Sequence, residues 1–406
     1  MIDMTSNPAG VLGFKVAGVA AGLKADSALD FTLIVSETPC TVAGVFTTNQ
    51  VKAAPVLVDM EKVAANPTGM RAVAVNTKCA NACTGQLGIE NAHKMAQLTA
   101  DKLGVPAETV LVMSTGVIGT QLPMDKIARG IDLAADALGN DWFSAAQGIM
   151  TTDTRPKAVH FAFPINGKEV HLSGIAKGAG MIAPNMATML SVIVTDAAIS
   201  QPDLDAVLKR VNEGTFNSIA VDGDTSTNDT VLVLANGASG ATVDNPAALE
   251  QFEIMLGAAC ELLAREIVRD GEGATKFIQI TVSGTQNKDD ARKIANTIAT
   301  SPLVKTAFYG ADANWGRILA AAGRAGVPLD ASKLSLSIAP LKGGDAVQLI
   351  AHGEPTGYSE AAATAIMQGA EIRVDLDCGL TSGNAVKVWT CDLSHDYVSI
   401  NGHYRS

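Results

Sequence analysis

The 406-residue sequence contains few aromatic residues (4%) and few charged ones (17%). Disordered chains commonly combine high charge with little hydrophobic surface. The low charge and a hydrophobic share of 47% therefore exclude extensive disorder and indicate a sizeable core. Lysine and arginine are also fewer than aspartate and glutamate, which gives a net charge of −11. Because nucleic-acid binding requires a basic patch that neutralises phosphates, we expect no nucleic-acid partner.

Long apolar runs and targeting signals are absent as well. No run of about 18 apolar residues occurs, so we expect no membrane-spanning helix. Residues 1–15 lack the charged segment followed by an apolar segment that marks a secretory signal. Among the six cysteines only Cys79 and Cys83 lie close together, and their spacing differs from the CxxC of redox and zinc pairs. We therefore expect free thiols and a cytoplasmic location.

Several motifs of phosphate, metal and hydrolase sites are also missing. The sequence has no GxxxxGK[ST] loop, no GxSxG elbow and no HExxH pair. Residues 270–276, DGEGATK, are glycine-rich but precede a strand, whereas a phosphate-binding loop follows a strand and opens a helix. Residues 222–230, DGDTSTNDT, begin like a calcium loop, but Thr227 occupies the position where an EF-hand needs glycine. We expect a polar turn or an active-site loop there, and no metal site.

Alternating and helical patterns follow one another along the chain. Residues 159–177 predict a hairpin, because Asn166–Gly167 suits a type I′ turn, and the two arms allow His160 and His171 to face each other. The other predicted strands are 31–37, 71–77, 109–115, 276–282, 371–377 and 385–393, and the predicted helices are 246–268 and 288–299. This mixed order favours an α/β or α+β layered sandwich over a simple doubly wound parallel sheet.

Thr188 lies between a loop of small residues and a predicted buried strand that begins at Met189. A threonine hydroxyl is a weak nucleophile unless a base lies beside it, and a chain-terminal threonine can use its own α-amine, whose pKa is about 8. Such a terminus would form if the hydroxyl attacked the carbonyl of Ala187 and water then cleaved the resulting ester. The pattern predicts self-cleavage between Ala187 and Thr188, and an ordinary turn or cap residue is the alternative at this point.

The segment around Thr188, KGAGMIAPNMATML, resembles the cleavage motif of the glutamate N-acetyltransferase (ornithine acetyltransferase) family of arginine biosynthesis. Further stretches resemble the same family in order, over nearly the whole chain: GVFTTNQVKAAPV, NACTG, STGVIG, TTDTRPK, GDTSTNDT, DGEGATK, GADANWGRI and NGHYRS. The resemblance implies a layered α/β fold similar to that of N-terminal-nucleophile hydrolases, although not identical in topology. It also implies a smaller C-terminal lobe that starts at about residue 280.

The same resemblance implies an activity. Cleavage would give fragments 1–187 and 188–406, intertwined in one globule, and two such pairs would form a heterotetramer of two alpha and two beta chains. Thr188 would take the acetyl group of N-acetylornithine and pass it to glutamate, without a metal or organic cofactor. Acetyl-CoA stays open as a second donor, because some family members accept it. The rivals are an amidase or aminopeptidase with the same nucleophile, and a non-catalytic binding protein with an intact chain.

The resemblance also implies the site residues. Thr115 and Gly116 match the oxyanion stabilisers, and a hydroxyl and an N–H aimed at a developing O⁻ in a dry site are effective donors. Lys177 matches a contact to the substrate carboxylate. The other matched substrate contacts are Thr151, Thr188, Glu272, Asn401 and Ser406. The family usually ends in threonine, so Ser406 is a departure that retains the hydroxyl and the terminal carboxylate.

Overall fold

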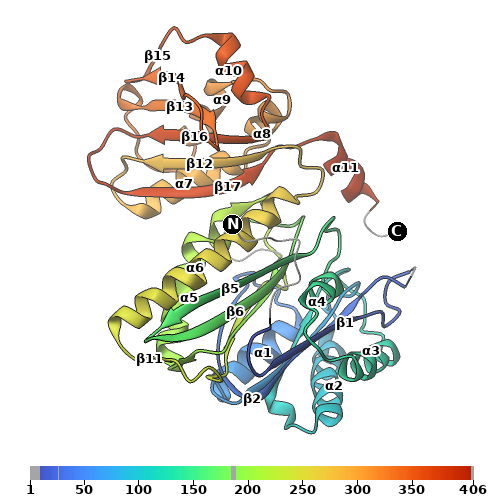
Figure 1. The fold of residues 1–406 in the computed structure, drawn as a ribbon. Coiled ribbons are helices and arrows are strands. Elements are labelled where there is room, and N and C mark those ends of the chain that lie inside the picture. The colour runs from blue at the N-terminus through green and yellow to red at the C-terminus, as the bar shows by residue number, and fades with distance from the viewer. Residues whose placement is uncertain (1–9, 26, 184–188, 404–406) are drawn as a thin grey trace. The chain divides into compact units, whose positions relative to one another are not determined.

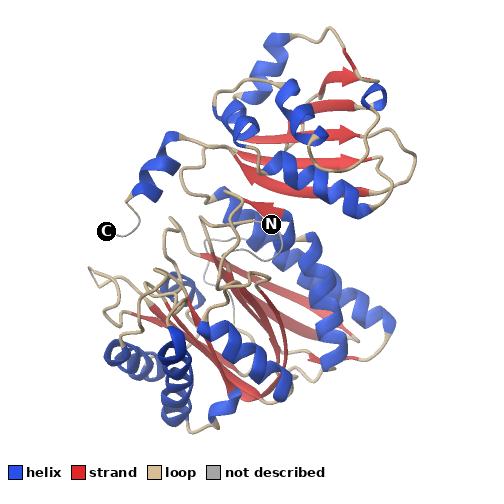
Figure 2. Ribbon diagram, turned by 180° about the vertical axis from the view of Figure 1, so that it is seen from behind, coloured by secondary structure: helices blue, strands red, loops and turns tan. Residues whose placement is uncertain are grey.

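The computed structural model describes residues 10–25, 27–183 and 189–403, which form two compact units (Figure 1). Unit 1 comprises Met1–Met181, Asn185–Asn217 and Asp224–Ile267, and unit 2 comprises Ile182–Pro184, Ser218–Gly223 and Val268–Ser406. Helices and strands are mixed in both units (Figure 2), so the predicted α/β class is confirmed. The predicted cleavage position lies outside the described residues, and the division into two fragments stays a prediction.

Among the described residues, eight strands of unit 1 form one sheet with the order β4-β3-β2-β10-β7-β6-β5, and β1 pairs with β2. They are β1 Phe14–Val19, β2 Phe31–Phe46, β3 Met70–Asn76, β4 Val110–Ser114, β5 Lys157–Ile165, β6 Lys168–Lys177, β7 Leu190–Thr195 and β10 Thr230–Ala235. The β3–β4 and β7–β10 pairs are parallel, and the other pairs are antiparallel. This mixture agrees with the expectation that the sheet is not doubly wound.

The helices of unit 1 lie against both faces of this sheet. They are α1 Ala54–Ala65, α2 Gly85–Leu103, α3 Met124–Asp136, α4 Trp142–Gly148, α5 Gln201–Gly214 and α6 Pro246–Arg269, and α6 crosses into unit 2 at its last residues. Short elements complete the unit: η1 Ala107–Thr109, β8 Ala198–Ile199, η2 Phe216–Ser218 and β11 Thr242–Val243. The α6 bounds confirm the helix predicted over 246–268.

Successive side chains along the strands of unit 1 point to opposite faces of the sheet and pack into different cores. Val73 of β3 and Val192 of β7 belong to one apolar core that both halves of the sheet share. Ala72 points to the opposite face of β3, into a second core that α1, α2 and α3 close. Leu263 of α6 packs near Gly174 on the outer face of β6. Strands β2, β3 and β4 and strands β6, β7 and β10 therefore share one core, into which α4 also packs through Trp142, Ala145 and Ala146. Helices α1, α2, α3 and α6 lie on the opposite faces of these strands, as in a layered sandwich.

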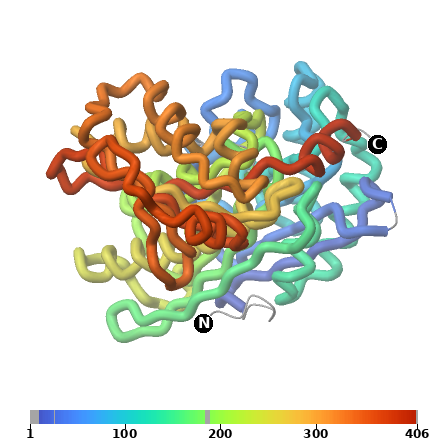
Figure 3. Tube along the Cα trace, turned by 90° about the horizontal axis from the view of Figure 1, so that it is seen from above, coloured from blue at the N-terminus to red at the C-terminus, as the bar shows by residue number. Residues whose placement is uncertain are grey.

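The β5–β6 hairpin has the predicted turn. Asn166 and Gly167 both have positive φ angles, of 49° and 78°, as a type I′ turn requires. Figure 3 follows the two paired strands to this turn. His171 Nδ1 lies 3.4 Å from His160 Nε2 and the rings stack, which confirms that the two histidines face each other across the arms.

The strand after residue 188 is also present, but it begins at Leu190, one residue later than predicted. The amide of Met189 donates to the carboxylate of Asp229 instead of joining the ladder of the sheet, at 2.8 Å. The prediction that the strand begins at Met189 is therefore wrong by one residue.

Unit 2 is built on a sheet that has seven strands within the described residues, in the order β15-β14-β13-β16-β12-β17-β9. The strands are β9 Ile219–Ala220, β12 Phe277–Ser283, β13 Ser335–Pro340, β14 Val347–Ala351, β15 Glu354–Pro355, β16 Glu371–Asp377 and β17 Ala385–Cys391. The helices are α7 Lys288–Ala299, α8 Pro302–Tyr309, α9 Trp315–Gly323, η3 Ala331–Lys333, α10 Glu360–Met367 and α11 His395–Gly402. The bounds of α7 match the predicted helix, which starts where Asn287 accepts the Asp290 amide.

One face of the unit 2 sheet forms its core. Ile278, Ile280 and Val282 alternate along β12 and pack with Ile294 of α7 and residues of α9 and α10. Within the described ranges, no helix combines the length and the apolar character needed to cross a bilayer.

Candidate active site

The structure brings Lys177 and Thr115 together inside unit 1. Lys177 ends β6, and Thr115 directly follows β4. The Lys177 ammonium donates to Thr115 Oγ1 at 3.4 Å, and the two residues are only 2% and 4% exposed. A charge beside a hydroxyl in so dry a place acts in a low effective dielectric, which strengthens its effect on any developing negative charge.

The loop after β4 has a shape that only glycine allows at its centre. Thr115 donates its N–H to Asn76 O at 3.0 Å, and Val117 donates its N–H to Lys78 O at 3.1 Å. Gly116, between them, has a φ of +132°, and a Cβ on it would lie 2.2 Å from the carbonyl carbon of Lys78. The backbone at Gly116 is therefore held close against residue 78, in a geometry that a larger residue cannot adopt.

A buried ion pair between Asp153 and Lys157 fixes the backbone directly after Lys177. Asp153 Oδ1 accepts from the Lys157 ammonium and from the Gly178 N–H, both at 2.7 Å, and Oδ2 accepts from the Thr151 N–H at 2.9 Å. The side chains of Asp153 and Lys157 are fully buried. One carboxylate thus fixes the backbone of Thr151 and of the residue after Lys177.

The ionisation of Asp153 follows from these neighbours. Burial by itself would raise the pKa of this carboxyl. The charges of Lys157 and Lys177, together with the Gly178 N–H, outweigh burial and hold the pKa of Asp153 well below its usual range. Asp153 and Lys157 were not among the predicted site residues, although both stand in the TTDTRPK motif. The signal that could have indicated them is their spacing, because an aspartate and a lysine stand four residues apart in a chain with few charged residues.

In unit 2, Glu272 is presented by the tight loop 270–276. It is 8% exposed, and its Oε2 accepts from Asn401 Nδ2 at 2.7 Å. Asp392 shapes the loop, because its carboxylate accepts from the N–H groups of Thr275 and Lys276 at 2.8 and 2.9 Å and from the Thr275 hydroxyl. The structure therefore places the predicted residues Glu272 and Asn401 in direct contact.

Helix α11, which carries Asn401, is fixed by a second contact. Tyr397 donates its hydroxyl to Asp222 Oδ2 at 3.1 Å, and Asp222 Oδ1 accepts the Ile182 N–H at 2.9 Å. Within unit 2, the Asp222 carboxylate therefore connects the backbone of Ile182 to helix α11 through two hydrogen bonds. The sequence analysis did not predict this link, because its three members are distant in sequence.

Three predicted positions lie outside the described residues: Ala187, Thr188 and Ser406. Thr115, Gly116, Thr151 and Lys177 lie in unit 1, and Glu272 and Asn401 lie in unit 2. In the part of the chain that the structure describes, no three histidine, cysteine, aspartate or glutamate side chains gather as a metal site would need.

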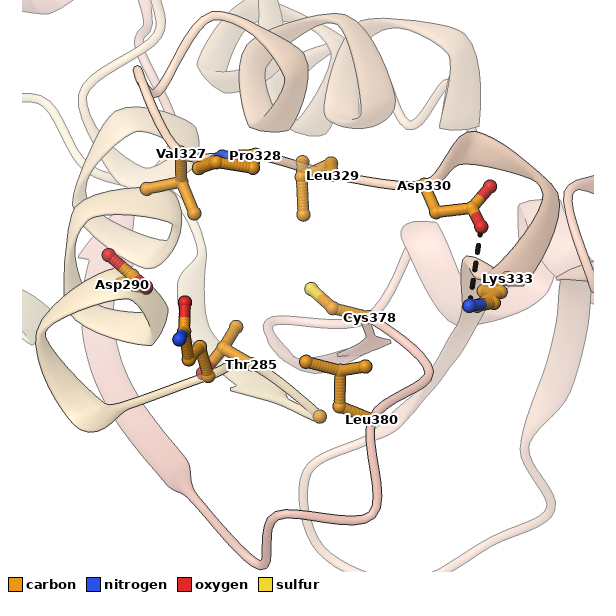
Figure 4. A pocket seen from close by; sticks show the side chains of 11 residues that line it. Thr285, Asp290, Val327, Pro328, Leu329, Asp330, Lys333, Cys378 and Leu380 are labelled. Atoms are coloured by element: carbon orange, nitrogen blue, oxygen red, sulfur yellow. Dashed lines mark ion pairs between the residues drawn. The ribbon is translucent and has the colours of Figure 1, made fainter.

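A cavity of about 520 Å³ lies within unit 2 (Figure 4). Val327 and Leu329 form one wall, Thr285 and Leu380 lie opposite, and Asp330 forms an ion pair with Lys333 at 3.4 Å. Of the residues predicted for the active site, none of those that the structure describes lines this cavity.

Comparisons with known proteins agree in the family they indicate. Residues 15–406 match the model of the ArgJ family. The chain is 47% identical to the arginine biosynthesis bifunctional protein ArgJ of Thermotoga neapolitana, over 97% of this chain and 99% of that protein. It is 46% identical to the protein of the same name from Geobacter sulfurreducens, over 98% and 100%. A crystal structure of the Bacillus halodurans protein of that name is 40% identical and covers 51% of this chain and 95% of its own, with a TM-score of 0.47.

Proposed function

Because the chain belongs to the ArgJ family, we propose that it is a glutamate N-acetyltransferase of the acetyl cycle of arginine biosynthesis. The observation that carries this proposal is the family match over residues 15–406, which includes every motif of the candidate site. The buried contact between Lys177 and Thr115 supports it, since it provides a polar centre in a dry environment.

The proposed reaction has two steps that share one nucleophile. After cleavage before Thr188, its hydroxyl attacks the acetyl carbonyl of N-acetylornithine while its α-amine accepts the hydroxyl proton. The C–N bond of the acetyl amide then breaks, the proton passes to the leaving nitrogen of ornithine, and an acetyl ester stays on Thr188. The α-amine of glutamate attacks this ester, which releases N-acetylglutamate and restores the hydroxyl.

Each predicted residue has a role in this proposal. The Thr115 hydroxyl and the Gly116 N–H stabilise the tetrahedral oxyanion, and the Lys177 ammonium binds the substrate carboxylate. Thr151 contacts the substrate as well, and its backbone is fixed by Asp153. We propose substrate contacts also for Glu272, Asn401 and Ser406, of which Glu272 suits the amine of ornithine by charge.

The proposal includes the assembly and the chemistry that the resemblance implies. Two pairs of fragments form the oligomer, the enzyme works in the cytoplasm, and no metal or organic cofactor takes part. Acetyl-CoA is an additional donor to be tested, because the relatives are named bifunctional.

The first experiment is the intact mass of the purified, denatured protein. We expect two fragments of 187 and 219 residues, the second number being 406 − 187. The Thr188→Ala variant should give one species of 41.8 kDa and no transferase activity. A Thr188→Ala protein that still cleaves itself would rule out Thr188 as the nucleophile.

The acceptor is then identified with N-acetylornithine alone. A transferase should release about one equivalent of ornithine per active site and stop as the acetyl-enzyme, until glutamate is added. Continuous release of acetate without glutamate would instead show an amidase that passes the acyl group to water.

A further inference from the structure

The motif GDTSTNDT supplies a polar segment, residues 226–229, that the proposed function does not use. Asn228 is 5% exposed, and its Nδ2 donates to Ala80 O at 2.7 Å and to Ser114 O at 2.8 Å. Ser114 directly precedes Thr115 in the chain. Asn228 therefore holds the backbone at the end of β4, directly before residues 115–117, the loop that carries Thr115 and Gly116 and is called the oxyanion loop below.

The next residue of the polar segment, Asp229, contacts the residue directly before β7. Asp229 is fully buried, and its Oδ1 accepts the N–H of Met189 at 2.8 Å. This N–H belongs to the peptide bond that joins Thr188 to Met189. Two consecutive side chains thus hold two segments that are far apart in sequence, the loop that carries Thr115 and the start of the strand that follows Thr188.

The polar segment is itself fixed on the side of β2. Thr47 donates its hydroxyl to Ser226 O at 2.6 Å and its N–H to Asp229 O at 2.9 Å. The Thr227 hydroxyl donates to Asn228 Oδ1 at 2.6 Å, which fixes the orientation of the Asn228 amide. All of these groups are buried, so the segment is a rigid support rather than a solvated turn.

We propose that Asn228 and Asp229 are positioning residues that set the spacing between the oxyanion loop and the start of the strand that follows Thr188 in the sequence. This inference rests on the proposed function, because it takes Thr188 as the nucleophile and Thr115 with Gly116 as the oxyanion donors. Its basis is the pair of opposed contacts, Asn228 to Ser114 and Asp229 to Met189.

The expected consequence is specific to the chemical step. Oxyanion donors act only when their distance to the reacting carbonyl is right, and a misplacement of about 1 Å can cost about 100-fold in rate. Substrate binding through Lys177 and Thr151 depends instead on the Asp153 carboxylate. Loss of the polar segment should therefore lower kcat and leave KM nearly unchanged.

The experiment compares two substitutions at one position. Asp229→Leu removes the acceptor of the Met189 N–H, whereas Asp229→Asn retains an acceptor oxygen of the same shape. For Asp229→Leu we expect kcat per active site to fall about 10- to 100-fold and self-cleavage to slow by a similar factor. Asp229→Asn should recover most of both rates, and KM should stay within about threefold in each variant. Active sites are counted by the burst of ornithine that acetyl-enzyme formation releases.

Asp59 provides the matched control. It is 1% exposed, its Oδ1 accepts the N–H of Val112 at 2.9 Å, and its Oδ2 has no hydrogen-bond partner among the described residues, as is also true of Asp229. Asp59→Leu should therefore destabilise the fold to a similar degree without lowering kcat per titrated site.

The possible outcomes separate this inference from the proposed function. If the unmodified chain transfers no acetyl group, the proposed function fails. If the unmodified chain is active and Asp229→Leu keeps its kcat, the positioning role is wrong. The role is also wrong if kcat falls as much in Asp59→Leu as in Asp229→Leu. Should Asp229→Leu not fold, Asn228→Ala decides by the same measurements, because it breaks the contact to Ser114 and leaves the one to Met189.

Discussion

Asp153 and Asp229 are both buried aspartates of unit 1, and their surroundings drive their pKa values in opposite directions. Asp153 contacts the Lys157 ammonium directly, and its pKa lies well below the usual range. Asp229 contacts an amide, and burial raises its pKa well above the usual value, although the Met189 N–H and the charge of Lys177 oppose this. Burial therefore prevails at Asp229, whereas at Asp153 the charges of Lys157 and Lys177 together with the Gly178 N–H outweigh it.

This difference assigns separate tasks to the two regions. The segment that contains Asp153 and Lys157 is charged, and its carboxylate is ionised next to Lys177. The polar segment 226–229 holds the Asp229 carboxyl, whose pKa burial raises and which accepts the Met189 N–H at 2.8 Å. Groups whose environments push their pKa values apart commonly divide the work of an active site in this way.

The largest effect is expected where the ion pair is broken. Asp153→Ala leaves the Lys157 ammonium buried without its carboxylate, and breaking a buried pair from one side costs about 3–5 kcal/mol. The free energy of unfolding, measured by urea titration, should fall by this amount. The loss for Asp229→Ala should be smaller, because no charge loses its partner there.

The double variant Asp153→Leu with Lys157→Met tests the origin of that loss. Replacing both charges by apolar groups of similar size is often neutral or stabilising. We expect the double variant to recover most of the stability but to have a higher KM than the unmodified chain, because the Thr151 and Gly178 N–H groups lose their acceptor. A double variant as unstable as Asp153→Ala would show that the loss comes from packing and not from charge.

An intermediate effect is expected in the pH dependence of stability. The raised pKa of Asp229 means that its contribution is complete below the unfolded pKa of about 3.9 and is lost as the pH rises toward the folded value. The side chain of Asp229→Asn does not titrate. Above about pH 4 the free energy of unfolding of this variant should therefore rise relative to that of the unmodified chain, by up to about 1.4 kcal/mol per pH unit.

The depressed pKa of Asp153 predicts the opposite sign. Its contribution is present above the unfolded pKa of about 3.9 and is lost as the pH falls. Unfolding free energies between about pH 3 and pH 8 should therefore show Asp153→Asn approaching the unmodified chain in acid. For Asp229, the contrary outcome would be equal slopes of unfolding free energy against pH for Asp229→Asn and the unmodified chain. Equal slopes would mean that folding does not raise the pKa of Asp229.

The sequence predicted the elements that local signals define. The turn at Asn166–Gly167 and the helix that starts after Asn287 are encoded by neighbouring residues, and both are where the pattern places them. The start of β7 is less local, because Asp229, 40 residues downstream, takes the amide of Met189 out of the ladder. Sequence pattern alone does not contain that contact.

The candidate site divides in the same way. Thr115, Gly116 and Lys177 stand in motifs whose residues are consecutive, so the resemblance alone predicts a role for each of them. The contact of Asn228 with Ser114 joins positions 114 residues apart, and no composition or spacing rule predicts it. The contacts that hold the oxyanion loop in place depend on tertiary structure, and sequence pattern does not contain them.

The smallest effect is expected at the support of the polar segment. Thr47→Val removes the hydroxyl that donates to Ser226 O and accepts the Asn49 N–H at 3.1 Å, but it retains the N–H that donates to Asp229 O. Loss of each buried hydrogen bond costs about 1–2 kcal/mol. Thr32→Val is the matched control, because its hydroxyl donates to Ala145 O at 2.8 Å in the same unit. If residues 226–229 set the geometry of the reaction, only Thr47→Val should lower kcat, by a few-fold, at equal loss of stability. Equal kcat losses in the two variants would mean that activity follows stability in both regions, and that the polar segment has no separate task.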